Sequence, residues 1–348
     1  MSLKSGDAAI VGAGIIGLAI AFELAQRGAT VRVFDRAEPA RAASWAAAGM
    51  LAPESEAVAD PSLMELCRNS LRRYPDFVER VREASGVDPR LRLDGILHAA
   101  FDTAHAQALR ARDGEFLERE ALLEREPWIG PSVTGALLVR GEGHVDNRRL
   151  GRALVAACER LGVMVARAEW ARVECDGRRV LGVRSDLGFT GAQTVVNACG
   201  CWAGQLEGVP QEALPNVEPV KGQMLALSVP AGLIRHATWV PGAYLVPRDD
   251  GRLLIGATSE RAGFDARVTA AGIDGLLHAA LAAAPSLGAF TVSETWAGLR
   301  PATPDGRPVI GPTPIAGLLN ATGHYRNGIL LAPVTASLIA DCVEYSLA

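Results

Sequence analysis

A glycine-rich turn near the N-terminus places the strongest constraint on the fold of this chain. The turn at 12–17 reads Gly-Ala-Gly-Ile-Ile-Gly, and it stands between an apolar segment at 8–11 and a longer one at 15–27. A third apolar segment follows at 30–35 and ends in an aspartate. This order predicts a strand, a helix and a second strand, the βαβ unit that opens a dinucleotide-binding domain.

Each glycine of the turn has a separate physical role in such a unit. Gly12 permits the tight turn, Gly14 lets a pyrophosphate approach the backbone, and Gly17 lets the helix pack closely on the strand. The positive N-terminal end of the helix then favours the anionic phosphates. Asp35 can accept hydrogen bonds from a ribose. The turn by itself is compatible with either NAD or FAD.

The sequence after the second strand does not continue into further βαβ units. Residues 41–53 read RAASWAAAGMLAP, and most of these side chains are very small. Such a run lets the backbone lie against a flat ring, although alanine is also the best helix former and the same letters fit a helix start. Gly49 and Pro53 disfavour the helix. A second glycine-bearing loop at 321–333 leads into a helix, whose N-terminus would suit a flavin because the reduced ring is negative near N1.

Length and charge limit the classes of protein that remain. A chain of 348 residues with 49% hydrophobic content exceeds the usual size of one core, so we expect two domains. The formal net charge of -4 argues against a surface for nucleic acid or anionic membrane. Small neutral or zwitterionic partners therefore remain, and a homo-oligomer is left open.

The cysteines and the apolar segments carry negative predictions. The six cysteines are scattered without a second ligand cluster, so we expect no metal site and interpret them as buried thiols. The polar segment 2–7 lacks the features of a signal peptide, which favours a cytoplasmic protein. We expect no apolar run long enough to cross a membrane, because the richest one, 328–343, contains Pro333. We expect this segment to form a buried C-terminal helix.

The remaining pattern predicts an α/β fold with an α+β second domain. A long helix should begin at Asp60 and Pro61, bury Leu63, Leu66, Tyr74, Phe77 and Val81, and bend or divide at Pro75. A further helix is expected at 148–161. Strands are expected at 95–101, 135–140, 163–170, 194–198, 217–227, 243–246, 252–255 and 291–297.

We therefore expect two discontinuous domains. A Rossmann-like dinucleotide domain should comprise 1–88, 144–214 and 299–348, and a mainly antiparallel β-sheet domain for the substrate should comprise 89–143 and 215–298.

Seven segments in order resemble the D-amino-acid oxidase superfamily, most closely its glycine oxidase branch, which is linked to thiamine biosynthesis. They are GAGIIG at 12–17, AAAGML at 46–51, VVNACGCW at 195–202, PVKGQ at 219–223, YLVPR at 244–248, WAGLRP at 296–301 and the loop at 323–333. The resemblance implies an FAD cofactor. The branch that attaches its flavin through cysteine has that residue ahead of a Thr-Pro-Asp turn, and no cysteine occurs at 298–305. The flavin is therefore expected to be non-covalent.

The resemblance also implies individual site residues. It assigns FAD contacts to Ile15, Ile16, Asp35, Arg36, Ala43, Ser44, Ala48, Gly49, Met50, Val173, His324, Tyr325, Arg326, Asn327, Gly328, Ile329 and Leu330. It places Arg300 on the substrate carboxylate and has Tyr244 and Arg326 line the substrate pocket. Two positions depart from the pattern, because Asp35 stands where many flavoproteins have glutamate and Ser259 stands where a glycine oxidase can have methionine.

Other interpretations of these side chains remain open from the residues alone. Arg300 suits a carboxylate because its guanidinium makes two parallel charged hydrogen bonds, but a buried arginine can equally pair with a structural carboxylate. Tyr244 fits a core aromatic, and His324 fits a hydrogen-bonded loop histidine.

The leading hypothesis is oxidation of glycine, sarcosine or a small D-amino acid to the imine and keto acid. Dioxygen would reoxidise FAD and yield hydrogen peroxide. The alternatives are a D-amino-acid dehydrogenase that uses a quinone and a flavin-binding subunit of a hetero-oligomeric amine dehydrogenase.

Overall fold

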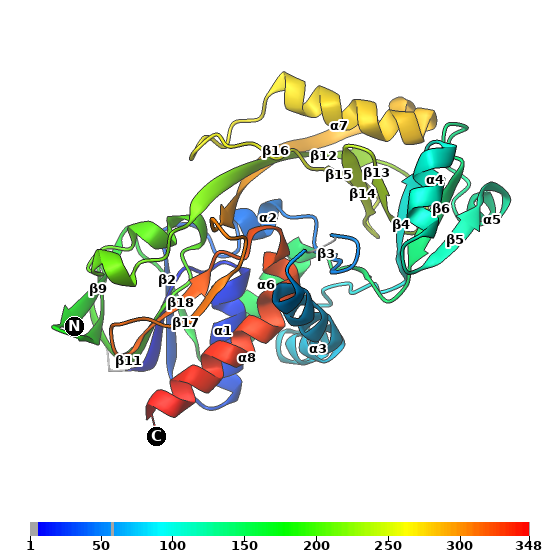
Figure 1. Cartoon of the computed structure of the whole chain (residues 1–348). Helices are drawn as coiled ribbons and strands as arrows, with labels where there is room; N and C mark the ends of the chain where they lie inside the picture. Colours follow the sequence, from blue (N-terminus) through cyan, green and yellow to red (C-terminus); the bar gives the residue numbers. More distant parts are fainter. Residues whose placement is uncertain (1–5, 57–58, 348) are drawn as a thin grey trace.

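The glycine turn lies at the centre of the expected βαβ unit. The computed structural model describes residues 6–56 and 59–347 (Figure 1). Strand β1 (Gly6–Val11) leads into helix α1 (Ile15–Gln26), and β2 (Val31–Asp35) returns parallel to β1. The N-terminal residues 1–5, which carry most of the argument for a cytoplasmic protein, lie outside the described residues.

The first sheet is built around this unit from segments far apart in sequence. Its order is β17-β18-β11-β1-β2-β8, and β10 extends β11 with β9 beyond it. The five central strands run parallel, as a dinucleotide-binding sheet requires. The added strands are β8 (Met164–Arg167), β9 (Ala171–Asp176), β10 (Arg179–Ser185), β11 (Gly188–Asn197), β17 (Val309–Pro312) and β18 (Leu318–Thr322).

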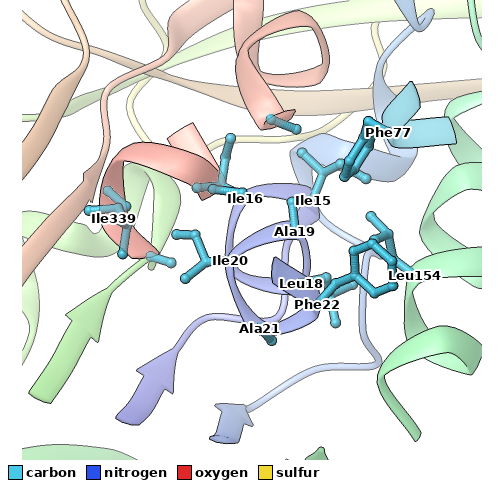
Figure 2. Packing of buried hydrophobic residues seen from close by; sticks show 14 of the residues in the cluster. Ile15, Ile16, Leu18, Ala19, Ile20, Ala21, Phe22, Phe77, Leu154 and Ile339 are labelled. Atoms are coloured by element: carbon cyan, nitrogen blue, oxygen red, sulfur yellow. The ribbon is translucent and has the colours of Figure 1, made fainter. Parts of the chain in front are cut away.

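Helix α1 is apolar on all sides because other helices enclose it. Helices α3 (Pro61–Ser85), α6 (Asn147–Arg160) and α8 (Gly328–Leu347) share one hydrophobic core with it. Figure 2 shows Phe77 of α3, Leu154 of α6 and Ile339 of α8 around the α1 side chains. Burial on every face fixes the N-terminal end of α1, which faces the site described below.

Helix α3 begins as predicted but does not divide. The Asp60 carboxylate accepts hydrogen bonds from the amides of Ser62 and Leu63, and Pro61 is the first helical residue. The division at Pro75, one of the two expected outcomes, does not occur: Pro75 is exposed, so water can reach the carbonyl that it leaves without a donor. Leu63 and Leu66 are only partly buried, which corrects their placement in the core.

Helix α8 also continues through its proline, and the reason is visible in the hydrogen bonds. Pro333 cannot donate to the carbonyl of Ile329, and the Tyr74 hydroxyl donates to that oxygen at 3.0 Å. The Ser70 hydroxyl similarly donates to the carbonyl of Leu330 at 2.6 Å. Two side chains of α3 thus stabilise α8 at its first turn.

This helix corrects one prediction and agrees with another. The segment Tyr325–Glu344 is long and apolar enough to cross a bilayer, with a mean hydropathy of 1.3, so the expectation that no such run exists is wrong. However, 61% of the apolar 18-residue window within it is buried inside the protein. That burial is typical of a core helix, as predicted for this segment.

The second sheet is mainly antiparallel, as predicted. Its order is β16-β12-β15-β14-β13-β4-β6-β5, and only the pairing of β13 with β4 is parallel among the described strands. The strands are β4 (Ile96–Ala100), β5 (Glu115–Glu118), β6 (Gly135–Val139), β12 (Glu218–Ser228), β13 (Ala237–Val240), β14 (Ala243–Pro247), β15 (Arg252–Gly256) and β16 (Thr291–Ala302).

Helix α7 (Ala270–Ala283) covers one face of this sheet, and α4 (Thr103–Arg110) and α5 (Arg119–Arg125) pack at its far end (Figure 1). Strand β16 continues past the expected strand end at 297, so Arg300 lies inside a strand. The domain limits remain predictions.

The alanine-rich segment lies between the two sheets in an irregular form. It contains a single helical turn, α2 (Ala43–Ala46), and then an extended pair, β3 (Met50–Leu51), which joins β7 (Gly143–His144). Helix and extended backbone thus each account for part of it.

Three cysteines, Cys175, Cys199 and Cys342, are partly exposed, which corrects the expectation that all six are buried.

Candidate cofactor and substrate site

An elongated cavity of about 500 Å³ lies between the two sheets. Its walls come from β1, β2 and β18 of the first sheet, from the segment that directly follows β11, and from β12, β14 and β16 of the second sheet. This volume lies within the usual range of small-molecule sites. Most of the residues implied by resemblance line it: Gly12, Gly14, Ile15, Ile16, Asp35, Arg36, Ala43, Ser44, Ala48, Gly49, Met50, Tyr244, Arg300, His324, Tyr325, Arg326, Gly328 and Ile329.

The glycine turn forms one end of the cavity, and steric contacts explain its composition. A Cβ on Gly12 would lie 2.3 Å from the carbonyl oxygen of Ala198, and the φ of Gly12 is 109°. A Cβ on Gly17 would lie 1.9 Å from the carbonyl oxygen of Gly12. Gly17 is outside the cavity wall and serves the contact between helix and strand. The turn therefore needs glycine where it does, and α1 begins at the cavity.

Two side chains hold the turn and can still form hydrogen bonds with a ligand. The Asp35 carboxylate accepts hydrogen bonds from the amides of Ala13 at 2.7 Å and Ala37 at 2.9 Å. Each carboxylate oxygen retains a lone pair that can accept from a ribose hydroxyl. The Ser44 hydroxyl accepts from the amide of Ile15 at 2.8 Å, so its proton can be donated to a phosphate at the α1 N-terminus.

Beyond Asp35 the cavity has an aromatic and cationic wall. The Arg36 guanidinium lies 4.5 Å from the centre of the Trp202 ring, which stacks on Phe264. Residues 168–171, directly after β8, form the opposite side.

Val173 lies elsewhere: it is 2% exposed in a hydrophobic cluster, and its amide donates to Glu207. The cavity lining does not support the FAD contact implied for Val173, because the lining residues of this segment end at 171.

The small-residue segment forms the middle of the cavity, and two polar residues that the sequence analysis missed hold it there. The buried Arg248 guanidinium donates to the carbonyl of Ala48 at 2.7 Å and to the Asn147 side chain at 3.1 Å. Asn147 in turn donates to the carbonyl of Ser44 at 2.8 Å. Burial lowers the pKa of Arg248 to about 10, so the group stays charged at neutral pH. Arg248 belongs to the YLVPR segment that carries the family resemblance, but the sequence assigned it no role. No sequence feature pointed to Asn147.

The C-terminal loop supplies the opposite wall through the start of α8. His324 is buried and hydrogen-bonded to the Thr335 hydroxyl at 3.0 Å, and burial lowers its pKa to about 3. It is therefore a neutral structural histidine. Gly328 and Ile329 line the cavity.

Two neighbours in this loop do not reach the cavity. Asn327 caps the loop through its amide, which donates to the carbonyl of His324, and Leu330 is in the core. Their implied FAD contacts find no support in the wall.

Arg300 and Tyr244 stand at the end of the cavity under the second sheet. The Arg300 guanidinium donates to the carbonyl of Thr258 at 3.1 Å and makes no salt bridge with any residue that the structure describes. A Cβ on Gly222, from the facing strand, would lie 2.2 Å from this guanidinium, so glycine makes the space for it. Burial raises the pKa of Tyr244, which keeps its hydroxyl protonated. The pairing of Arg300 with a structural carboxylate is thus not seen.

Glu56 is a further residue of this end that the sequence analysis missed. It lines the cavity, and its carboxylate pairs with Arg326 at 2.8 Å. Burial raises the pKa of Glu56, and the Arg326 charge opposes that rise. No motif surrounds Glu56 in the sequence, and only the fold brings it to Arg326.

The arrangement fits a flavin dinucleotide. The Asp35 carboxylate and the glycine turn suit the adenosine ribose and the pyrophosphate, and the wall at 46–50 suits a flat ring. These residues would hold FAD with its ring toward Arg300.

Comparison with known proteins places the chain among enzymes of this kind. It is 36% identical to glycine oxidase of Pseudomonas putida, over 97% of this chain and 94% of that one. The fold matches the crystal structure of glycine oxidase from Geobacillus kaustophilus with a TM-score of 0.89 and 36% identity, over 98% and 95% of the two chains.

A bifunctional ThiO/ThiG protein of Synechocystis sp. is 40% identical over 97% of this chain, which spans about half (52%) of that relative's length. Residues 7–342 match the FAD dependent oxidoreductase (DAO) family. The chain therefore belongs to the DAO family of FAD-dependent oxidoreductases.

Proposed function

We propose that this chain oxidises a small amino acid, namely glycine, sarcosine or a small D-amino acid, with dioxygen as the final acceptor and hydrogen peroxide as a product. The observation that carries this proposal is Arg300, a cavity guanidinium without a carboxylate partner among the described residues. The glycine oxidase relatives support it. A role in thiamine biosynthesis belongs to the same proposal, because relatives are named ThiO/ThiG. A cytoplasmic location remains a prediction.

The chemistry follows from how the cavity holds a zwitterion-sized molecule. The Arg300 guanidinium binds the carboxylate through two charged hydrogen bonds, which fix direction as well as position. The protonated Tyr244 hydroxyl is a second donor on the same side. When bound, FAD supplies the acceptor for the hydride that leaves Cα. With the amine neutral, its lone pair assists that departure, so the protein acts mainly by orientation and needs no side chain as a base.

The same wall limits the size of the substrate. Met224 and Tyr244 are buried beside Arg300, and the Ser259 hydroxyl lies 3.5 Å from that of Tyr325. Ser259 occupies less space than the methionine that a glycine oxidase can have here. The space beside Ser259 can therefore accommodate a short substituent on Cα or nitrogen.

We further propose that FAD is held without a covalent bond. The two cysteines on the cavity wall, Cys199 and Cys201, have pKa values raised to about 12 by burial. They are thiols at neutral pH and poor nucleophiles. Acid precipitation of the purified protein should release all flavin into the supernatant. Yellow flavin that stays with the denatured chain would contradict this.

The decisive experiment uses the isolated chain, loaded with FAD, in air. Glycine, sarcosine and D-alanine are added separately, and peroxide and flavin bleaching are measured. Peroxide from the isolated chain supports the oxidase. Bleaching that reverses only with an added quinone would replace it by a dehydrogenase. If no amino acid bleaches the flavin, the chain is better explained as a subunit that requires partners.

A further inference from the structure

We propose that Glu56 sets substrate specificity: it neutralises Arg326, so that the site accepts one carboxylate and rejects a second. The rejected class comprises N-substituted glycines that carry another carboxylate, with iminodiacetate as the simplest probe. This inference rests on the proposed function. It explains why, of the two guanidinium groups at the substrate end of the cavity, Arg300 is available to substrate and Arg326 is not.

The contact between the two side chains is specific. Arg326 approaches Glu56 through two nitrogens, with Nε 2.8 Å from Oε2 and Nη2 3.3 Å from Oε1. The Glu56 side chain is 12% exposed and that of Arg326 is 36% exposed. A two-point pair with one buried partner orients Arg326 toward Glu56 rather than toward the cavity interior.

The charges at this end of the cavity add up to one open cationic site. Arg300, Arg326 and Glu56 are the charged residues of the wall around Tyr244, and the other charged wall residues (Asp35, Arg36, Glu169 and Glu207) come from the first sheet or from segments next to it. Both arginines act electrostatically on Glu56 and on Tyr244, so the groups are close. With Arg326 paired, Arg300 alone faces an incoming carboxylate. A second carboxylate would meet Glu56 with the same charge.

Removing the Glu56 charge should leave Arg326 in place. Its guanidinium also lies 5.8 Å from the centre of the Trp239 ring, and this cation–π contact does not involve Glu56.

The backbone at Glu56 is held independently as well. The Ser55 hydroxyl donates to Glu142 at 2.5 Å and is 2.8 Å from Nε2 of His98. Glu142 also accepts from the amide of Glu54 at 2.5 Å. Glu56→Gln thus changes a charge on a fixed scaffold.

The test compares iminodiacetate with sarcosine, which differ by one carboxylate. In Glu56→Gln, kcat/KM for iminodiacetate should rise by about tenfold or more, because like-charge repulsion is removed and the Arg326 charge is no longer neutralised. The kcat/KM for sarcosine should change far less. Glu56→Ala should show the same change of ratio. In the double variant Glu56→Gln/Arg326→Gln the gain should be lost.

A matched control tests whether any lost carboxylate in this loop has the same effect. Glu54→Gln removes a carboxylate two residues away whose partner is the exposed Arg68. The ratio of the two substrates should stay at the wild-type value. An equal gain in Glu54→Gln would overturn the assignment to Glu56.

A binding measurement keeps the inference separate from turnover. Oxydiacetate has an ether oxygen in place of the amine and cannot be oxidised to an imine, and its binding should be measurable as a change in the flavin absorption spectrum. It should bind about tenfold tighter to Glu56→Gln than to wild type, with equal FAD content. Equal affinities would overturn the inference even if sarcosine is oxidised normally. If wild type oxidises no amino acid, the proposed function fails, and oxydiacetate affinity still decides the role of Glu56.

Discussion

The two ends of the cavity are built from different materials. At the dinucleotide end, backbone amides and glycines form most of the site, and Asp35 and Ser44 are fixed by hydrogen bonds to the turn itself. At the substrate end, four side chains from four separate segments meet: Glu56, Tyr244, Arg300 and Arg326. One end is a local structure, and the other depends on the packing of the two sheets.

This difference determines what a mutation can do. A backbone site is changed only by distorting the turn, so substitutions there should act on FAD retention and leave specificity alone. A site of converging side chains can be altered one group at a time, with a separate effect on each substrate. The following predictions test this separation, beginning with the largest effect.

Arg300→Leu should remove the substrate anchor without touching the cofactor. Loss of a bidentate charged pair in a desolvated site costs about 3 to 5 kcal/mol, a hundredfold to a few thousandfold in kcat/KM. FAD content, measured from the absorption ratio, should stay near normal. Arg300→Lys should recover only part of the loss, because an ammonium keeps the charge but not the fork.

The opposite result would contradict the separation between the substrate end and the dinucleotide end. If Arg300→Leu keeps near wild-type efficiency with normal FAD, Arg300 is structural, and Arg326 becomes the leading anchor.

Asp35→Ala should show the reverse pattern. The variant loses an acceptor for the ribose and the contacts that fix Ala13 and Ala37. A hydrogen bond to a charged group is worth about 1.5 to 3 kcal/mol, so the FAD dissociation constant should rise about tenfold to a hundredfold. The kcat at saturating FAD should change little.

A second aspartate provides the matched control. Asp7 accepts from the amide of Thr30 at the other end of β1, away from the cavity, so Asp7→Ala should retain FAD normally. Unchanged FAD affinity in Asp35→Ala would remove Asp35 from the site.

The sequence predicted the dinucleotide end better because its determinants are contiguous. Gly12, Gly14, Gly17 and Asp35 belong to one βαβ unit whose spacing follows from helix and strand geometry. Glu56 gains its meaning from Arg326, which is 270 residues away in sequence. No periodicity connects such residues, and only the packed fold brings them together.

The wrong predictions have the same origin. Counting Pro333 as an interruption of the apolar run is a local argument, but Tyr74 compensates for that proline from another helix. The FAD contact that the resemblance implies for Val173 finds no support in the cavity wall, because the chain turns into a hydrophobic cluster before it reaches this residue. Asn147 and Arg248 hold carbonyls of the small-residue segment, which they reach only through the fold, so they carried no motif.

Each half of the fold also contains a buried neutral histidine, and both should make stability depend on pH. Burial lowers the pKa of His98 in the second sheet and of His324 beside the cavity to about 3. An unfolded histidine has a pKa of about 6.5. A lowered folded pKa contributes stability above pH 6.5 that is lost as pH falls toward 3, because only the unfolded chain takes up the proton.

A difference measurement isolates this contribution for His98. Between pH 7 and pH 5 it amounts to about 2 kcal/mol, so His98→Gln should cost that much less unfolding free energy at pH 5 than at pH 7. Urea unfolding with saturating FAD measures it. The exposed His278→Gln should show no such change between the two pH values. A cost for His98→Gln that does not depend on pH would mean that His98 is also protonated when folded.

Gly222→Ala is the smallest change that should affect the substrate end and leave the dinucleotide end unchanged, since it displaces the substrate anchor with a single methyl group. The new Cβ would lie 2.2 to 2.4 Å from the Arg300 guanidinium. That guanidinium is the far end of a flexible side chain, so it should move while the strand pairing and the fold remain. A misplacement of 1 Å can cost up to a hundredfold in rate, and we expect a loss of roughly tenfold in kcat/KM.

The loss should appear mainly as a higher KM, with FAD content and melting temperature unchanged. Gly275→Ala is the matched control, because a Cβ there meets nothing within 4 Å, and its kinetics should equal wild type. A fall in melting temperature with unchanged kcat/KM would show that Gly222 serves the packing of β12 on β16. The space for Arg300 would then not be what requires glycine at this position, and the substrate end would depend on its strands more than on its individual side chains.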